Sequence, residues 1–393
     1  MNAHKWLSRE VLLISLSAFF ADLGYQSVVG LLPIYITGIL EQKPYVFGLI
    51  MALTYGIGSF ISYAGGRLGD RLNKRRVALA GNLLIPLLSF SGLPANAAGS
   101  AGLYMGGWFA RDFRSPPRRA MLVEASDPAY RSNVFGMLHA LDVGGGTVSA
   151  FLAFVFLSYG VPIGQVMLFS AVPIIISSIV LFMTKGERNE NYAKSLASSA
   201  TAPVRDEART SDRRLFLAAV ALFGFSYYSL GFPIITVSSE TGSYALGIAT
   251  YAVFLFSSGL SGLFFGSMKL NALGALWKLG YTVAALGSLF LAVSYQFHEG
   301  VLSFYMATAV LGLGAGVIET YEPVVTASLS PHSGLSRGLG ALSQWRSIGL
   351  FTSNLLMGLL FTVSIFSSYL YAFVTAITGA VMLAILAGRT KTG

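Results

Sequence analysis

The chain lacks cysteine altogether, and it has only four histidines and few charged residues among its 393 positions. Without cysteine there is no disulfide framework and no thiolate site. The four histidines have no metal-ligand spacing, so we predict neither a metal nor a cofactor. Charged residues make up 11% of the chain, against roughly 25% in soluble domains. This composition excludes an ordinary soluble domain and leaves a chain that is 54% hydrophobic.

Charged residues are absent from long stretches that recur along the chain. The stretches without Asp, Glu, Lys or Arg are 44–66, 77–110, 143–184, 215–239, 241–268 and 347–388. A helix needs about 20 apolar residues to cross the hydrocarbon core, and a helix satisfies its own backbone hydrogen bonds there. We therefore predict an all-α polytopic membrane protein. Its twelve transmembrane helices are expected near 10–34, 45–66, 77–97, 101–121, 133–157, 162–184, 214–237, 244–267, 274–294, 301–322, 337–360 and 364–387.

The net charge of +9 follows from membrane topology. Of the 26 Lys and Arg residues, Lys43 falls outside and three lie within spans, which leaves 22 in cytoplasmic segments or at their edges. This asymmetry is typical of the positive-inside rule, with both termini in the cytoplasm. We predict a multi-pass protein of the cytoplasmic (inner) membrane that works as a monomer in the lipid bilayer, and the basic balance does not indicate a nucleic-acid partner.

One polar segment divides the predicted helices into two equal groups. Residues 185–213 are rich in Ser, Ala, Asn and mixed charge, a composition that cannot bury a core. We predict a six-helix bundle over 1–184, a cytoplasmic linker over 185–213, and a second six-helix bundle over 214–393.

The two groups of helices resemble each other weakly at an offset near 200 residues. Leu32-Pro33-Ile34 aligns with Phe232-Pro233-Ile234, and Gly66 aligns with Gly266. A constant offset across each half indicates a six-helix pseudo-repeat. Parallel repeats of this kind are typical of transporters with a site at the midplane between the halves.

The loop after the second predicted span resembles the signature of the major facilitator superfamily, G-x-L-x-D-R-x-G-[RK]-[RK]. Asn73 stands where the second glycine is expected, and the matching residues are Gly66, Leu68, Asp70, Arg71, Lys74 and Arg75. The resemblance implies the fold of that superfamily and a cytoplasmic latch at this loop. Gly66 would permit a close helix approach, and Asp70 would meet a helix N-terminus and neighbouring arginines.

Two further spans resemble antiporter motifs of the same superfamily less closely. Arg111 lies where the fourth-helix motif places an arginine linked to proton coupling. Gly136 and Gly145 fit the glycine motif of the fifth helix, but Ser149 and Ala150 stand where Gly-Pro is expected. The resemblance therefore implies proton coupling and leaves antiport, symport and uniport open.

Ionisable residues within predicted spans are the candidates for function, because a charge at the bilayer centre costs at least ~2.5–3.5 kcal/mol. Asp22 lies in the middle of the first span, with Gln26 one turn further on. A carboxylate out of water can exchange protons near neutral pH, so Asp22 is our first proton-carrier candidate. The alternative is a hydrogen bond to another helix.

Opposite charges at matching depth predict a second coupling element. Arg111 and Arg114 share a face of the fourth span, and Asp142 lies at a similar depth in the fifth. We expect Asp142 to pair with one of these arginines and to release it on protonation. The alternative is a buried ion pair that only fixes packing.

The substrate path is predicted from polar and aromatic residues within spans. Two acids near the end of the tenth span, Glu319 and Glu322, lie either in the path or at the interface, and we favour the interface. The path candidates are Gln26, Arg114, Tyr227, Tyr228 and Arg346.

These features together predict a secondary active transporter and not an enzyme. It is expected to be proton-coupled, to alternate access about a midplane site, and to export a metabolite or drug. The first alternative is a symporter or uniporter that imports a small organic anion, since the intramembrane arginines favour an anionic solute. The second is a receptor that retains the fold without transport.

Overall fold

A computed structural model of the chain describes residues 7–126, 131–186, 207–224, 226, 230–268, 270–329 and 335–392. Within these ranges every regular element is a helix, as expected for a chain that must satisfy its backbone hydrogen bonds inside a bilayer. The chain also divides into two compact units, which are described separately below. The first unit comprises residues 1–40 and 57–202, and the second comprises 41–56 and 203–393.

The first half of the chain contains long helices with short irregular ends. Proline interrupts one of them: Pro86 lies where α3 gives way to the 3₁₀ segment η2, because proline lacks the N–H that an α-helix needs. The elements are α1 (Arg9–Ile34), η1 (Tyr35–Ile39), α2 (Pro44–Arg71), α3 (Lys74–Leu84), η2 (Ile85–Gly92), α4 (Ala97–Ala125), α5 (Arg131–Ser158), α6 (Ile163–Phe169) and α7 (Ala171–Phe182).

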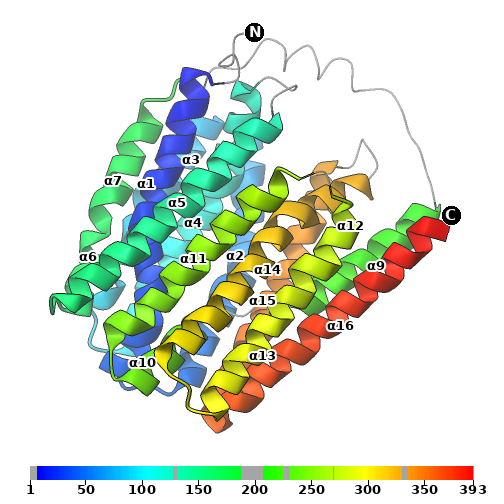
Figure 1. Cartoon of the computed structure of the whole chain (residues 1–393). Coiled ribbons are helices and arrows are strands. Elements are labelled where there is room, and N and C mark those ends of the chain that lie inside the picture. The colour runs from blue at the N-terminus through cyan, green and yellow to red at the C-terminus, as the bar shows by residue number, and fades with distance from the viewer. Residues whose placement is uncertain are drawn as a thin grey trace. The chain divides into compact units, whose positions relative to one another are not determined.

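The second half repeats the pattern of long helices separated by short connections. In Figure 1, α9 and α16 lie side by side, and α13 lies next to α14. The elements are α9 (Glu207–Gly224), α10 (Gly231–Thr241), α11 (Tyr244–Gly266), α12 (Ala272–Ala275), η4 (Leu276–Tyr281), α13 (Thr282–Gln296), α14 (Val301–Ser328), α15 (Leu335–Val363) and α16 (Ile365–Thr392).

In the described part of the chain, nine helices are long and apolar enough to cross a membrane. The predicted spans 77–97, 101–121 and 214–237 are not among them. Each has a physical reason: α3 breaks into η2, α4 carries several arginines, and α9 begins in the charged segment that follows the linker. The all-helical membrane fold is confirmed, and the number of twelve spans stays a prediction.

Polar residues at helix starts explain several of the observed boundaries. Asn73 caps α3 by accepting a hydrogen bond from the Arg76 N–H at 3.2 Å. Asn96 caps α4 in the same way, with Gly99 as the donor at 2.8 Å. Asparagine at the N-cap satisfies a backbone N–H that the first helical turn leaves without a partner. The replacement of the signature's second glycine by Asn73 therefore provides the start of α3.

Glycines set the closest helix contacts of the first unit. At Gly145 of α5, an added Cβ would lie 2.5 Å from the Phe19 carbonyl oxygen and 3.1 Å from the Leu23 nitrogen, both on α1. Just beyond it, the Ser149 hydroxyl accepts a hydrogen bond from the Ser27 N–H at 2.8 Å. Small residues and interhelical hydrogen bonds are the usual means of association where water supplies no hydrophobic driving force. The α1–α5 contact thus fixes the surroundings of the α1 side chains.

The second unit uses the same device between α13 and α14. An added Cβ at Gly314 would lie 2.5 Å from the Ala284 nitrogen, and one at Gly287 would lie 2.5 Å from the Leu311 nitrogen. On the other side of α14, Gly316 packs against the Ser258 carbonyl of α11. Close backbone approach on two sides makes α14 the central helix of this unit.

Two adjacent glycines of α5 give a matched test of the α1–α5 contact. Gly145→Ala would place a methyl group against the α1 backbone, and such overpacking costs about 1–3 kcal/mol. Gly144→Ala meets nothing within 4 Å and removes a poor helix former. In thermal unfolding of the detergent-solubilised protein, we expect Gly145→Ala to lower the midpoint and Gly144→Ala to leave it equal or higher. Equal midpoints for the two variants would contradict the described packing.

Candidate functional site

Asp22 is buried in the first unit and held by its own helix. Its side chain is 4% exposed. The Tyr25 hydroxyl donates to Asp22 Oδ1 at 2.5 Å, and the Gln26 amide Nε2 donates to the same oxygen at 2.9 Å. Residues three and four positions apart share a helix face, so α1 alone provides both donors. The sequence left open a hydrogen bond between Asp22 and another helix. The two hydrogen bonds described here come from α1 itself.

Arg111 of α4 lies on the aromatic side chains next to this carboxylate. Its guanidinium carbon is 5.7 Å from the centre of the Tyr25 ring and 4.8 Å from the centre of the Trp108 ring. Guanidinium groups are attracted to the electron-rich faces of such rings, most strongly out of water. Arg111 also forms an ion pair with Asp112, with 2.9 Å between Nη1 and Oδ1. The cation is therefore held beside Asp22 by Tyr25 and Trp108.

Asp142 approaches the same carboxylate from α5. It is close enough to act electrostatically on both Asp22 and Tyr25, because Gly145, one turn further on, brings α5 against α1 at Asp22. Its Oδ1 atom is buried without a hydrogen-bond partner. The three proton-coupling candidates, Asp22, Asp142 and Arg111, thus come together in one unit.

The predicted ion pair between Asp142 and Arg111 or Arg114 is wrong. Arg111 pairs with Asp112 instead, and Arg114 donates to Asn82 Oδ1 at 2.5 Å. The reason is the helix packing: α5 packs along α1, whereas α4 packs along α3 and η2. Asp142 therefore meets the α1 carboxylate, and a matching depth in sequence did not make α4 its partner.

Arg114 is part of a buried polar network of the first unit. Its side chain is 1% exposed and donates to Asn82 of α3. Asn82 in turn donates to Ser178 Oγ at 2.7 Å and to Ser177 Oγ at 3.3 Å, and Ser177 donates to the Ser17 carbonyl at 2.6 Å. Hydrogen bonds thus run from α4 through α3 and α7 to α1. In this conformation Arg114 joins helices and is not exposed to a solute.

The loop after α2 differs from the expectation for the latch. The side chain of Asp70 is 79% exposed, and Lys74 Nζ lies 4.0 Å from its Oδ1. Lys74 is closer to Glu124 at the end of α4, at 3.0 Å. Asp70 thus does not meet the predicted helix N-terminus and arginines, because Asn73 already caps α3.

The close helix approach that was expected at Gly66 occurs at its neighbours Gly65 and Gly69 instead. Gly69 approaches the Pro117 Cβ, which would lie 2.9 Å from an added Cβ, and Gly66 is in ordinary contact with Pro116, at 3.4 Å. Gly65 packs against the Phe113 carbonyl, which cannot receive a hydrogen bond from Pro117. The end of α2 therefore packs on the segment of α4 where Pro116 and Pro117 interrupt the backbone hydrogen bonds of the helix. Of the other motif residues, Arg75 donates to the Phe182 carbonyl at the end of α7 at 2.5 Å.

Glu319, Glu322 and Arg346 form a cluster in the second unit. Arg346 Nε donates to Glu322 Oε2 at 2.5 Å, and its Nη1 lies 3.0 Å from Glu319 Oε1. The Glu322 side chain is 1% exposed, so the protein encloses it, and the interfacial position of the two acids stays a prediction. Arg346 faces two carboxylates, which makes it a poor partner for an anionic solute in this conformation.

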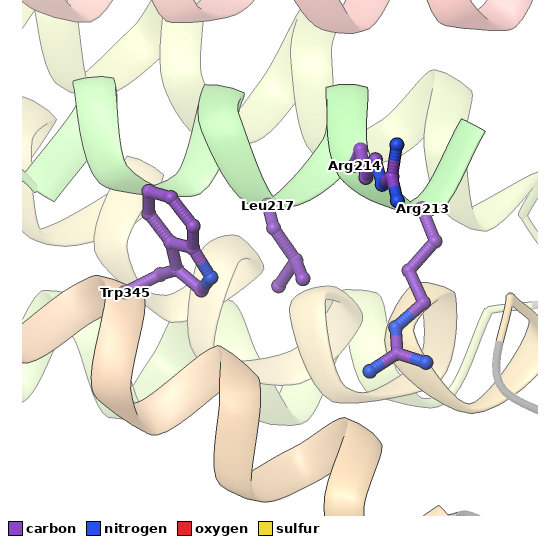
Figure 2. A pocket seen from close by; sticks show the side chains of 4 residues that line it. All are labelled: Arg213, Arg214, Leu217 and Trp345. Carbon is purple, nitrogen blue, oxygen red and sulfur yellow. The ribbon is translucent and has the colours of Figure 1, made fainter. Parts of the chain in front are cut away.

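Two of the predicted path residues, Tyr227 and Tyr228, lie outside the described residues. A pocket of about 510 Å³ opens between α9 and α15. Figure 2 shows Arg213 and Leu217 extending from α9 and Trp345 extending from α15, with Arg214 also at the rim. The pocket combines two guanidinium groups with an apolar wall.

Sequence reasoning missed two polar partners of the buried charges. Asn82 was visible as an amide in the charge-free stretch 77–110, and a buried amide requires hydrogen bonds. Tyr281, which donates to Glu322 Oε1 at 2.6 Å, gave no signal, since most tyrosines in such spans only pack. Among the described residues, no three His, Cys, Asp or Glu side chains come together as metal ligands.

Comparisons with known proteins agree with this architecture. The sequence is 23% identical over 388 residues to an uncharacterized MFS-type transporter of Methanocaldococcus jannaschii, covering 96% of this chain and 94% of that protein. Solved structures that resemble the fold include a POT family transporter in complex with 5-aminolevulinic acid, with a TM-score of 0.76, 11% identity, and coverage of 97% of this chain and 96% of that one. The nucleoside transporter NupG gives a TM-score of 0.73 at 12% identity, with 96% and 100% covered.

The similarity to these solved structures shows the fold, and the match of the sequence to a family profile shows the family. The profile described as Major Facilitator Superfamily matches residues 14–354, which includes the loop after α2 and the intramembrane charges of both units. The chain therefore belongs to the Major Facilitator Superfamily and is a membrane transporter of that type.

Proposed function

We propose that this transporter couples the movement of a small solute to protons, with Asp22 as the proton carrier and Asp142 as its partner. The observation that carries the proposal is the packing of α5 on α1 at Asp22, where an added Cβ at Gly145 would lie 3.4 Å from the Asp22 Cβ. Asp142, one turn earlier on α5, thereby acts on a buried carboxylate that already has two hydrogen-bond donors. Two carboxylates in a shared dry site repel each other when both are ionised. Binding one proton removes that repulsion, so the pair is suited to take up and release protons during transport.

Arg111 can link the protonation of Asp22 to solute binding. The guanidinium acts on Asp22 electrostatically and lies on the Tyr25 ring, whose hydroxyl binds the same carboxylate. When Asp22 is ionised, Arg111 balances its charge. When Asp22 is protonated, the positive charge of Arg111 is available to an anionic group or to a new partner. Proton binding and solute binding then compete through one cation.

We assign the direction as export by proton antiport from the cytoplasmic membrane, with a monomer whose termini lie in the cytoplasm. Antiport is supported by Gly145, which fits one position of the antiporter glycine motif and packs on α1 at Asp22. A second candidate is uptake of a small organic anion with protons. It is favoured by Arg118, which is 4% exposed and has two guanidinium nitrogens without hydrogen-bond partners, since a buried cation of this kind favours an anion nearby.

The coupling assignment predicts the behaviour of two conservative variants in proteoliposomes. Asp22→Asn and Asp142→Asn should lose solute movement driven by a pH gradient by at least about tenfold, while solute exchange without a gradient persists. The reason is that an amide keeps the size of the carboxylate and one acceptor oxygen but cannot take up a proton in this pH range. Glu240→Gln is the matched control, because Glu240 belongs to the second unit and interacts with His298 there, and it should behave like the wild type.

Two outcomes decide between the alternatives. Solute that leaves the compartment as protons enter supports antiport, and solute that moves with the protons supports uptake. If Asp22→Asn, Asp142→Asn and the double variant all accumulate solute in a proton gradient as the wild type does, the coupling assignment is wrong.

We propose further that Lys74 forms the latch of the loop after α2, with Glu124 as its near partner and Asp70 as its exposed one. The free energy of unfolding of Asp70→Asn should be within about 1 kcal/mol of the wild-type value, because exposed ion pairs contribute little to stability. It should nevertheless slow turnover several-fold with solute binding retained. Glu124→Gln removes the closer partner, and we expect it to lower the thermal midpoint more than Asp70→Asn does. If Asp70→Asn has the turnover of the wild type, the loop is not a latch, and its basic residues only reflect membrane topology.

A further inference from the structure

The second unit contains a buried charge cluster that the proposed coupling site does not use. Glu322 of α14 accepts a hydrogen bond from the Tyr281 hydroxyl at 2.6 Å and another from Arg346 Nε at 2.5 Å. Glu319, one turn earlier on α14, lies 3.0 Å from Arg346 Nη1. The cluster thus joins η4, α14 and α15 around one guanidinium.

The surroundings of Glu322 make this cluster costly unless its charge is balanced. The groups that act on Glu322 electrostatically are Arg346 of α15, Tyr281 of η4 and Glu319 on its own helix. Phe223 of α9 stacks on the Tyr281 ring, with 4.2 Å between centres, and closes the tyrosine side with an apolar group. Arg346 is thus one positive charge between two carboxylates. If both carboxylates are ionised, one negative charge is left unbalanced, and an unbalanced charge in buried surroundings costs several kcal/mol.

The two carboxylates differ in how far the protein encloses them. The side chain of Glu319 is 36% exposed, whereas that of Glu322 is 1% exposed, and Arg346 lies between them at 27%. Two acids that share one cation titrate as a pair, and the proton belongs to the pair. Glu319 is the less enclosed of the two acids, and Arg346 can pair with whichever carboxylate remains ionised.

We propose that Glu319, Glu322 and Arg346 form a second proton-binding site, which holds one exchangeable proton in the second unit. With both acids ionised, Arg346 bridges them. With one acid protonated, the cluster is neutral and Arg346 keeps a single strong partner. The site depends on α14 and α15 staying together, so its protonation changes how tightly Arg346 connects these helices. Its role in transport rests on the proposed proton coupling, but proton binding itself can be measured without a solute.

Proton uptake by the purified full-length protein in detergent tests this site directly. A pH indicator reports the number of protons that each protein takes up when the medium is shifted from alkaline to mildly acidic. We expect Glu322→Gln to take up one proton fewer than the wild type, because the remaining Glu319–Arg346 pair is already neutral. Glu319→Gln should show the same loss, and it provides the test if Glu322→Gln does not fold.

Tyr281→Phe is the matched control, since it removes a hydrogen bond to Glu322 but leaves the charges unchanged. It should take up as many protons as the wild type. A cluster that only stabilises the fold would give a different pattern: all three variants would lose thermal stability, and their proton uptake would equal that of the wild type. Unchanged uptake in both glutamate variants would overturn the proposal.

The same measurement keeps this proposal separate from the coupling site of the first unit. Asp22→Asn should lose a proton of its own, and Asp22→Asn combined with Glu322→Gln should lose both. A loss in the glutamate variants with normal uptake in Asp22→Asn would support the second site and contradict the first. The reverse pattern would leave only the first site.

Discussion

A charged side chain inside a bilayer has to find its counter-charge within the protein, because the surrounding hydrocarbon provides no water to stabilise it. This constraint organises both units of the transporter. In the first unit, Arg111 is balanced by Asp112 and by the aromatic faces of Tyr25 and Trp108. In the second, Arg346 is balanced by two glutamates. Each arrangement leaves at least one carboxylate whose charge state affects the others, and such groups are suited to proton-driven work.

The helices are packed so that these charged groups have fixed neighbours. Glycines bring α5 against α1 and α13 against α14 at distances that no larger side chain allows. Serine and asparagine side chains then join helices through hydrogen bonds, as in the network from Arg114 through Asn82 to Ser177. Inside a membrane, close backbone contact and polar bonds have to replace the hydrophobic effect as the source of helix association. The same contacts therefore hold the fold together and place Asp142 at Asp22.

The sequence predicted the helical membrane fold well, because charge-free stretches follow directly from the thickness of the bilayer. It also identified Asp22, Arg111 and Asp142, since an intramembrane charge is conspicuous in an apolar chain. It failed where partners depend on helix packing. Asp142 meets α1 instead of α4, Glu322 is buried on Arg346, and Lys74 prefers Glu124 to Asp70. Depth can be read from spacing along a helix, but the choice of neighbouring helix comes from small residues whose contacts only the folded chain defines.

In both proposed directions of transport, solute movement is coupled to proton movement. This coupling is tested most directly with wild-type protein in liposomes that contain a pH-sensitive dye, to which candidate solutes are added one at a time in the absence of any imposed proton gradient. For a transported solute, proton coupling predicts a change in internal pH that begins with solute movement and that a protonophore abolishes. Accumulation of a solute against its own gradient, without any pH change and unaffected by a protonophore, would show that transport is not coupled to protons.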